Sequence, residues 1–499
     1  MWQKTIIGLF TTLIVASRSF AAADLPLDLV IAYAASQSNQ SKDIKTKLLG
    51  SQSLRLRAEA PFATQLTSSA TITNAQLATT SSFAPDEANK QNLKFGATRY
   101  LASGTQVGIN FDYVQNDLTY PQLSNQASSF QGLAKYSETQ TVVFARQNLL
   151  RDSFGSATSQ NLDAVTASDR STKAQMRDDL EVYITSLISQ YFKVLELQAA
   201  YKAINERLKE QQKLSEVTKV KLQRGNAEET ELLQIEGSIH ELKWNLKDVK
   251  KSMQEIWNFT AISLGLPQEY LEIDVTKINL LFTDQTALAQ NLCRNQTPQT
   301  SHKIDALGQS LEAANLRLSA SKNLTAPTVY ADLRFLANGI DESMSKSVQD
   351  SILGKNPSWS ISLGIDWSIG EKIDRASLAD AFKTTSQLAI QKESVKDQLE
   401  IEWRNECEKL DLQIKRKTDF TDQAKRQKRR LDLENQRFAL GQTDVQAITL
   451  ASNSLISMLL QAENATSAIQ SSAWKIRYLA GTLDEHIKLS LQKIRKEAL

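Results

Sequence analysis

Residues that break helices or crosslink chains are scarce in this sequence of 499 residues. It contains only 17 Gly and 8 Pro, where average usage would supply about 7% and about 5% of the residues. Few breakers in a long chain predict long, uninterrupted elements. Three His and two Cys argue against a structural zinc site and against a disulfide framework.

A charge bias is also lacking, because 58 Lys and Arg stand against 56 Asp and Glu, for a net charge of +2. A balanced chain carries no electrostatic footprint for nucleic acid. Hydrophobic residues make up 41% of the sequence, which excludes wholesale disorder. The composition therefore indicates an ordered protein with long elements and no nucleic-acid partner.

The first 23 residues are typical of a secretory signal peptide. Lys4 supplies a positive n-region, residues 6–16 form an apolar stretch, and residues 19–23 offer small residues for cleavage. The alternative is an uncleaved membrane anchor, although the apolar stretch is shorter than the roughly 20 residues that a span needs. No later segment has 18 consecutive apolar residues, so we expect an exported chain without a transmembrane helix.

Two stretches of the chain are almost free of breakers. No proline lies between Pro121 and Pro267 or after Pro357, and apolar residues in both stretches recur at helical spacing. Each stretch is interrupted once by glycine in a polar turn, at Gly225 and at Gly441. We therefore expect two antiparallel helical hairpins. The arm before each turn, at about 159–224 and at about 375–440, would have about 65 residues and be roughly 100 Å long.

The two halves of the chain repeat. The turn glycines are 216 positions apart, and the strands that precede the long helices end at a similar offset, which indicates a duplicated domain. The expected organisation has five parts: signal peptide 1–23, first repeat 24–265, linker or equatorial segment 266–300, second repeat 301–482 and basic C-terminal tail 483–499.

Each repeat is expected to contain a helix, strands and a helical hairpin. The first has strands at about 61–150 and a hairpin at about 156–265. The second has strands at about 327–370 and a hairpin at about 371–482. An additional strand pair at about 93–114 fits either a barrel wall or a surface loop.

The clearest strand follows Pro357 and alternates strictly. Serine, glycine and aspartate point one way, and large apolar residues with an aromatic at each end point the other. This is the pattern of an outer-membrane strand with a polar lumen side, although half of a soluble sandwich would alternate in the same way. The expected lipid-facing residues are Trp359, Ile361, Leu363, Ile365 and Trp367.

The number of strands is too small for a barrel made by one chain. The sequence offers four clear strands and six at most, whereas single-chain barrels of the outer membrane start at about eight. Open sheet edges do not face lipid. A barrel must therefore be completed by other copies of the chain.

Several local sequence patterns, and their order along the chain, resemble those of the TolC-type outer-membrane efflux proteins, also called outer-membrane factors. The resemblance covers nearly the whole mature chain, with a duplicated arrangement of strands followed by a helical hairpin. Its most diagnostic part is the turn at Gln436–Val445. The other similar segments are Leu25–Asn39, Gln147–Arg151 and Tyr191–Leu195.

The resemblance implies an α+β membrane protein of the Gram-negative outer membrane. It would form a homotrimer in which four strands per protomer close a 12-stranded β-barrel, above a periplasmic α-barrel of helical hairpins. Its function would be a passive exit duct for tripartite efflux or type I secretion, linked by a periplasmic adaptor to an inner-membrane pump. The tips that contact the adaptor would be Arg224, Gly225, Asn226, Leu440, Gly441 and Gln442.

The family also closes its periplasmic mouth just after these turns. Thr230, Glu231, Phe438 and Asp444 are the candidates for this gate. An aspartate ring is not expected here, because the second repeat lacks the acidic residues of the pattern. For Glu231 and Asp444 the alternative is a solvated charge at a helix N-terminus.

No catalytic set, cofactor motif or metal-ligand spacing stands out, so an enzyme is not expected. A periplasmic adaptor or a coiled-coil scaffold without a pore remain the alternative functions. Cys293 and Cys407 lie in different parts of the chain. Although an exported protein permits disulfides, we expect these two positions to be far apart and the thiols to be free.

Overall fold

The computed structural model describes residues 24–497 apart from 77, 79–83, 121–133, 267–270, 272, 296–300 and 369–371. The expected signal peptide and parts of the expected linker lie outside the described residues. The chain divides into two units. The helical unit comprises residues up to 49, 172–306 and from 392 onward, and the sheet unit comprises residues 50–171 and 307–391.

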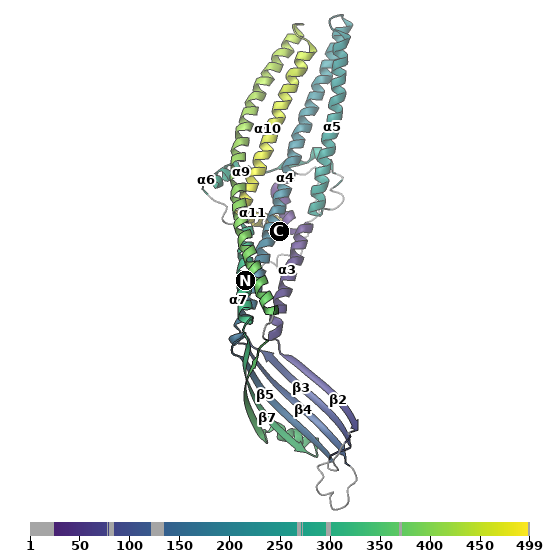
Figure 1. The fold of residues 1–499 in the computed structure, drawn as a ribbon. Helices are drawn as coiled ribbons and strands as arrows, with labels where there is room; N and C mark the ends of the chain where they lie inside the picture. Colours follow the sequence, from purple (N-terminus) through teal and green to yellow (C-terminus); the bar gives the residue numbers. More distant parts are fainter. Residues whose placement is uncertain are drawn as a thin grey trace, which may run out of the picture. The chain divides into compact units, whose positions relative to one another are not determined.

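Four long helices dominate the chain (Figure 1). They are α4 (Ser156–Gln223), α5 (Glu229–Leu264), α9 (Lys372–Ala439) and α10 (Val445–Leu479). Both α4 and α9 contain 68 residues, and their first residues are 216 positions apart, as are those of α5 and α10. The long helical hairpins and the duplication expected from the sequence are thus confirmed.

Besides the four long helices, the structure contains shorter helices and one small two-stranded sheet. In the small sheet, β1 (Asp24–Pro26) pairs in parallel with β6 (Asn279–Leu281). The shorter helices are α2 (Leu27–Ser36), α3 (Asn39–Glu59), α6 (Thr286–Asn295), α7 (His302–Leu324) and α11 (Leu483–Glu497). The described residues also include the 3₁₀ turns η2 (Ala60–Phe62), η4 (Ser153–Gly155) and η6 (Val275–Lys277).

One apolar core organises the helical unit. Its members come from α2, α4, α5, α10 and α11, with Phe192 and Trp474 among the largest fully buried side chains. The Tyr191 hydroxyl donates to the carbonyl oxygens of Leu25 and Leu281, both at 2.8 Å. These two acceptors explain why a tyrosine lies at that point of α4, since a buried hydroxyl needs a hydrogen-bond partner.

The segment set apart as a basic tail takes part in this core. Leu483 and Ile487 of α11 are buried with α2. The ring of His486 lies 3.1 Å from an Asp28 carboxylate oxygen and packs edge-on against Trp474. The first turns of the C-terminal segment are therefore integral to the fold.

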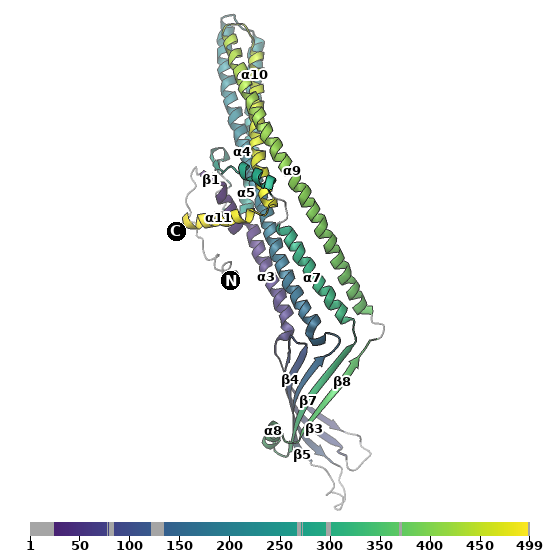
Figure 2. The same ribbon diagram turned by 90° about the vertical axis from the view of Figure 1, so that its left-hand side faces the viewer.

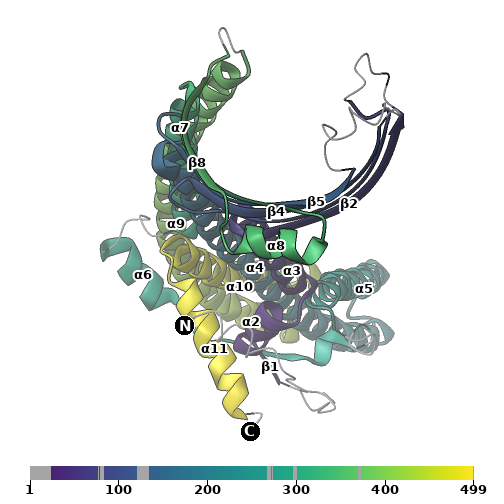
Figure 3. The ribbon, with the colours of Figure 1, turned by 90° about the horizontal axis from the view of Figure 1, so that it is seen from below.

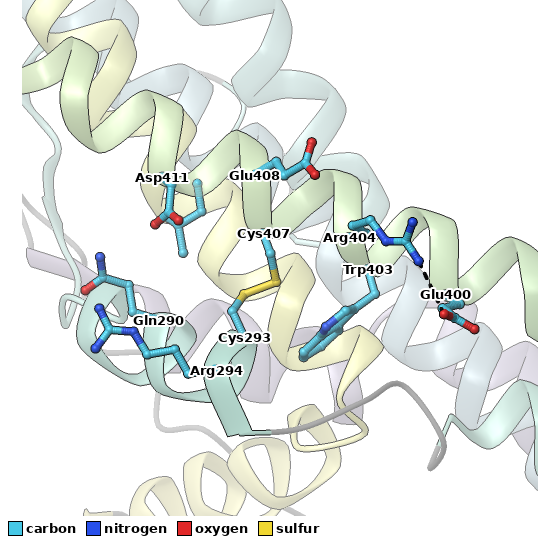
Figure 4. Close-up of a pocket in the computed structure, with 10 residues that line it drawn as sticks. Gln290, Cys293, Arg294, Glu400, Trp403, Arg404, Cys407, Glu408 and Asp411 are labelled. Atoms are coloured by element: carbon cyan, nitrogen blue, oxygen red, sulfur yellow. Dashed lines mark hydrogen bonds and ion pairs between the residues drawn. A yellow bond between two sulfur atoms is a disulfide. The ribbon is translucent and has the colours of Figure 1, made fainter.

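The expectation of two free thiols is wrong, because Cys293 and Cys407 form a disulfide (Figure 4). The Cα atoms of the two cysteines are 5.9 Å apart. Helix α6 packs against α10, and the Gln470 side chain of α10 donates to the Asp284 carboxylate at 2.6 Å. This packing brings Cys293 of α6 against Cys407 of α9, although 114 positions separate them in sequence.

The sheet unit contains one antiparallel sheet of six strands in the order β2-β3-β4-β5-β7-β8 (Figures 1 and 2). Neighbouring strands in the sheet are neighbours in sequence apart from the step from β5 to β7. The strands are β2 (Gln65–Gln76), β3 (Glu87–Tyr100), β4 (Thr105–Thr119), β5 (Lys135–Asn148), β7 (Thr328–Asp341) and β8 (Pro357–Asp366). Helix α8 (Met344–Ile352) lies between β7 and β8 in sequence.

Candidate functional site

The first candidate site is the apolar face of the six-stranded sheet. Strand pairing places Trp359 beside Phe335 and Ile361 beside Leu333, and carries the same face across β5, β4 and β3 to β2. Single chains of soluble proteins rarely expose an apolar patch of this extent. Its exposed large residues are Leu66, Ile72, Phe95, Ile109, Val143, Leu333, Phe335, Trp359, Ile361, Leu363 and Ile365. Trp367, also expected on this face, is exposed just beyond the end of β8.

The opposite face of the sheet is polar. Lys94 of β3 forms an ion pair with Asp112 of β4 at 3.0 Å, and the Gln140 side chain of β5 donates to Asn338 of β7 at 3.3 Å. Ser358, Ser360 and Ser362 lie on this face of β8. The two faces have the contrast of a barrel wall, with lipid on one side and an aqueous lumen on the other.

Two glycines on the polar face make room for aromatic rings. A Cβ atom at Gly108 would lie 2.5 Å from the Phe144 ring, and one at Gly364 would lie 2.4 Å from the Tyr330 ring. The Arg146 guanidinium lies 3.6 Å from the centroid of the same Tyr330 ring. Each ring therefore covers the glycine of the adjacent strand, a device that stabilises glycine positions in sheets.

The structure settles the place of the additional strand pair. β3 and β4 lie within the sheet, with β2 on one side and β5 on the other. Phe95 and Ile109, which belong to this pair, continue the apolar face. The chain therefore differs from the expectation of four strands per protomer, because six strands form one continuous sheet.

The sheet is curved, and α8 lies on its convex side (Figure 3). The Ser347 hydroxyl of α8 is 2.8 Å from that of Thr139, and the Ser351 hydroxyl is 2.9 Å from that of Thr141. Thr139 and Thr141 belong to the same face as Val143. The apolar face is thus the convex one, and α8 covers part of it.

The second candidate site consists of the two helix turns. Gly225 has φ +74° and Gly441 has φ +70°, in the left-handed region that favours glycine. The backbone N–H of Asn226 donates to the carbonyl oxygen of Lys221, and the backbone N–H of Gln442 donates to that of Arg437, both at 2.9 Å. Both helices therefore end in the same Schellman motif.

Contacts between the hairpins join the two turns. The Lys221 ammonium donates to the carbonyl oxygen of Phe438 at 2.8 Å and lies 3.7 Å from the centroid of its ring. Phe438 belongs to a small apolar core with Ile235, Leu431 and Val445. This core fixes the ends of α4, α5, α9 and α10 to one another.

The structure gives the gate candidates different local roles. The Asp444 carboxylate accepts from the Ala447 amide at 2.8 Å and caps α10. Glu231 lies in the first turn of α5, and the Thr230 hydroxyl donates to the Glu228 carboxylate at 3.1 Å. Phe438 is buried in the tip core. In contrast, the tip residues Arg224, Gly225, Asn226, Leu440, Gly441 and Gln442 are all exposed.

A buried carboxyl that sequence reasoning missed lies in the helical unit. Burial, reinforced by the nearby carboxylates of Asp484 and Asp178, raises the pKa of Glu181 to about 8. The His302 ring of α7 lies 3.6 Å from its carboxyl oxygen. In the sequence Glu181 follows the charged residues Arg177, Asp178 and Asp179, so its burial could not be recognised there. Among the described residues, no group of His, Cys, Asp or Glu is arranged to hold a metal ion.

Comparison with solved structures identifies this arrangement. The outer-membrane protein VceC of Vibrio cholerae matches with a TM-score of 0.65 and 15% identity over 91% of this chain and 96% of VceC. The chain has the fold of an outer-membrane channel. The channel CmeC of Campylobacter jejuni matches with a TM-score of 0.64 and 12% identity over 93% and 89% of the two chains.

The likeness extends over nearly the whole length of these outer-membrane proteins. The MtrE channel of Neisseria gonorrhoeae, solved in an open state, matches with a TM-score of 0.60 and 14% identity over 94% of both chains. No family model and no curated protein matches the sequence. The outer-membrane channel fold is therefore established by structure, at a sequence identity of only 12–15% to these three proteins.

Proposed function

We propose that the protein is a trimeric duct of the Gram-negative outer membrane. Substrate would enter it from an inner-membrane pump and a periplasmic adaptor, and leave the cell without energy input from the duct itself. The observation that carries this proposal is the curved sheet with a convex apolar face and a polar opposite face. Such a sheet is stable in lipid only when its edges are closed into a barrel.

Uncovered helix surfaces support assembly with further copies. On α9, Ile390, Ile401 and Leu412 are exposed and follow one another at intervals of 11 residues. Apolar residues at that spacing form a nearly straight row along a helix. Helix α10 is long and apolar enough to pass as a membrane span, yet most of that window is not buried. Neighbouring helices of other copies would cover these rows in a helical tube.

The two helix turns are proposed as the contact site for the adaptor. Leu440 is 73% exposed at the tip, although it is a large apolar residue. Gly225 and Gly441 lack side chains and have no heavy atom within 4 Å of an added Cβ, so another backbone can approach them closely. Thr230, Glu231, Phe438 and Asp444 are proposed to shape the periplasmic mouth through the local contacts described above.

The proposed duct is tested by measuring the mass of the detergent-extracted protein and its conductance in a planar bilayer. The detergent-extracted protein should migrate near three times the monomer mass when unheated and as a monomer after boiling. In a planar bilayer it should give discrete conductance steps. A salt-extractable monomer without conductance would contradict the proposal and favour the adaptor or scaffold alternatives.

The adaptor contact has its own test. A photo-crosslinking residue at Leu440 should capture a periplasmic protein with a long helical hairpin, whereas the same residue at Ile390 should capture another copy of this chain. Capture of the adaptor from Ile390 but not from Leu440 would move the contact away from the tips.

A further inference from the structure

The sheet in this chain is larger than the four-stranded share expected from the resemblance. The first repeat contributes four strands, β2 to β5, and the second contributes two, β7 and β8. Because the repeats otherwise match in helix length, the pair β3–β4 is an addition to the first repeat. We propose that this pair widens the transmembrane barrel to 18 strands, six from each of three copies, an inference that rests on the proposed trimer.

The additional pair has the features of a barrel wall. Phe95 and Ile109 lie on the convex apolar face, while Lys94 and Asp112 form their ion pair on the polar face. A hairpin in a surface loop would have no reason to match both faces of the sheet. The register is continuous, with 14 residue pairs between β3 and β4 and 12 between β2 and β3.

The two outer strands have the right directions to pair between copies. β2 and β8 each have one partner strand within the described residues and are the edges of the sheet. Strand directions alternate across the six strands, so β8 of one copy would run antiparallel to β2 of the next. An even number of strands per copy preserves this alternation around the whole ring.

The apolar face must also continue across this contact, and this restricts the register. On β2 the apolar face holds even-numbered residues such as Leu66 and Ile72, and on β8 it holds odd-numbered residues such as Ile361 and Leu363. To join the apolar faces of two copies, β8 and β2 must pair with an offset along the strands, measured from a line perpendicular to them. This offset must be an even number of residues per copy. A shift by one residue would turn Trp359 into the lumen.

Strand tilt selects among the allowed shifts. A line perpendicular to the strands passes through Gln65, Thr98, Gly108, Phe144, Arg334 and Ser360. With about 3.3 Å per residue and about 4.8 Å between strands, shifts of six, eight and ten residues over six strands give tilts of about 35°, 42° and 49°. Strands in β-barrels are tilted by about 35–45° from the barrel axis, and the tilt given by an eight-residue shift lies nearest the middle of this range.

An eight-residue shift pairs Ser360 with Thr73 of the next copy. It leaves all ten residues of β8 opposite β2, with Thr71 opposite Ser362 and Ile72 opposite Ile361. At a tilt of about 42°, ten residues span about 25 Å, which is the height of the apolar band of outer-membrane barrels.

The addition changes the size of the pore. At this tilt and spacing, 18 strands give a backbone diameter of about 37 Å, compared with about 25 Å for 12 strands. Barrels of 16 to 18 strands leave an aqueous channel. The membrane part of the duct would then exclude neither small solutes nor an extended polypeptide.

Paired cysteines test the contact between copies. Thr71→Cys combined with Ser362→Cys should form a disulfide between copies on oxidation, and a ladder ending at a covalent trimer should appear. Thr71→Cys combined with Ser358→Cys is the matched control and should react much less. Dominant crosslinking of Thr71→Cys with Ser360→Cys, or of Thr73→Cys with Ser362→Cys, would indicate a shift of six or ten residues and overturn the eight-residue register. No crosslinking in any of these four pairs would overturn the contact.

Spin labels on adjacent residues test whether β4 lies in the wall. A label on Ile109→Cys should collide with oxygen dissolved in lipid, and a label on Asn110→Cys should collide with a water-soluble nickel chelate. Equal access of the nickel chelate to both positions would place the pair in a surface loop and overturn the proposal.

Electron cryomicroscopy of the intact protein counts the strands directly. It should show 18 strands, and a variant lacking residues 87–119 should show 12. A conducting trimer with 12 strands and an external β3–β4 pair would overturn the wider barrel while leaving the duct intact. Absence of a trimer would instead contradict the proposed function. The spin-label result stands by itself if the deletion variant does not fold.

Discussion

Lys221 holds the two helix tips together, because its ammonium group reaches Phe438 of the other hairpin in two ways. It donates to the Phe438 carbonyl oxygen at 2.8 Å and lies 3.7 Å from the ring centroid. The carbonyl belongs to the last turn of α9, where helical i+4 donors run out, and it also accepts from the Gly441 backbone N–H at 3.1 Å. One side chain of α4 therefore caps α9 and covers its aromatic residue.

Replacing Lys221 with methionine should loosen the tips. The variant keeps an apolar stem but loses a charged hydrogen bond and a cation–π contact, together about 1–2 kcal/mol at a partly exposed site. Amide hydrogen exchange at residues 436–444 should accelerate roughly 5–30-fold. Lys219→Met, which alters an exposed lysine on the same turn of α4, is the control and should leave exchange unchanged. Equal acceleration in both variants would contradict the role of Lys221.

The turn glycines should respond to alanine in the opposite way to a glycine within a helix. Gly225→Ala adds a Cβ in open space but at φ +74°, so the cost is backbone strain of about 1–2 kcal/mol. Gly237 lies inside α5, also in open space, and Gly237→Ala should stabilise the helix by about 0.5–1 kcal/mol.

Hydrogen exchange measured across α5 and the preceding turn distinguishes the two effects. Exchange should be faster around the turn in Gly225→Ala and slower along α5 in Gly237→Ala. Destabilisation by both substitutions would show that these positions are crowded in the assembled protein.

The Cys293–Cys407 disulfide should stabilise the protein by restricting the unfolded chain. It spans 114 positions, and disulfides that close long loops typically contribute about 2–4 kcal/mol. Cys293→Ser and Cys407→Ser should lower the apparent melting temperature equally, and the double variant should add nothing further. Reductant should affect only the wild type. A larger loss in the double variant would mean that the cysteines act independently.

Sequence patterns predicted the long helices because one physical signal dominates there. Ile184 and Leu187 recur at helical spacing, glycine and proline are absent around them, and both side chains are buried. The disulfide could not be predicted in this way. Its formation depends on α6 packing against α10, which involves the polar contact of Asp284 with Gln470 and leaves no periodic trace in the sequence.

The strands likewise include one that the sequence predicts clearly, β8, and one whose place in the sheet it does not predict, β4. Trp359 and Ile361 predict a membrane strand by strict alternation, and in the structure β8 is an edge strand whose side chains are nearly all exposed. On β4 the alternation includes Gly108, whose surface is covered by the Phe144 ring of the next strand. The glycine fits the polar face of β4, but a hairpin in a surface loop can alternate in the same way, so the sequence of the strand cannot reveal whether it joins the sheet.

The raised pKa of Glu181 predicts that stability falls as pH rises. The folded state holds a proton up to a pKa of about 8, whereas the unfolded state releases it near 4.5. The folded state therefore binds more protons between these values, and its stabilisation is full below pH 4.5 and lost as pH passes 8. Asp178, Asp484, His302 and Arg177 surround the group.

Glu181→Gln imitates the protonated form and should flatten this dependence. The apparent melting temperature of the variant should exceed that of the wild type at pH 8.5 and approach it at pH 5. Glu229→Gln, at an exposed position of α5, should follow the wild-type curve. A variant that is less stable than the wild type at pH 8.5 would show that the ionised carboxylate has a stabilising partner.

Gly339 of β7 lies against the backbone of α8, so a methyl group there should displace the helix. An added Cβ would lie 2.0 Å from the Ser347 backbone oxygen, and the Ser347 hydroxyl donates to the Gly339 carbonyl oxygen at 2.9 Å. Backbone cannot yield as a flexible side chain does, so α8 must shift as a unit. Gly339→Ala should expose residues 342–356 to protease added outside intact cells, whereas Gly354→Ala, with open space around its Cβ, should strain only the turn after α8. Protection of the segment in Gly339→Ala would mean that the sheet bends to accept the methyl group and that α8 is held by its other contacts.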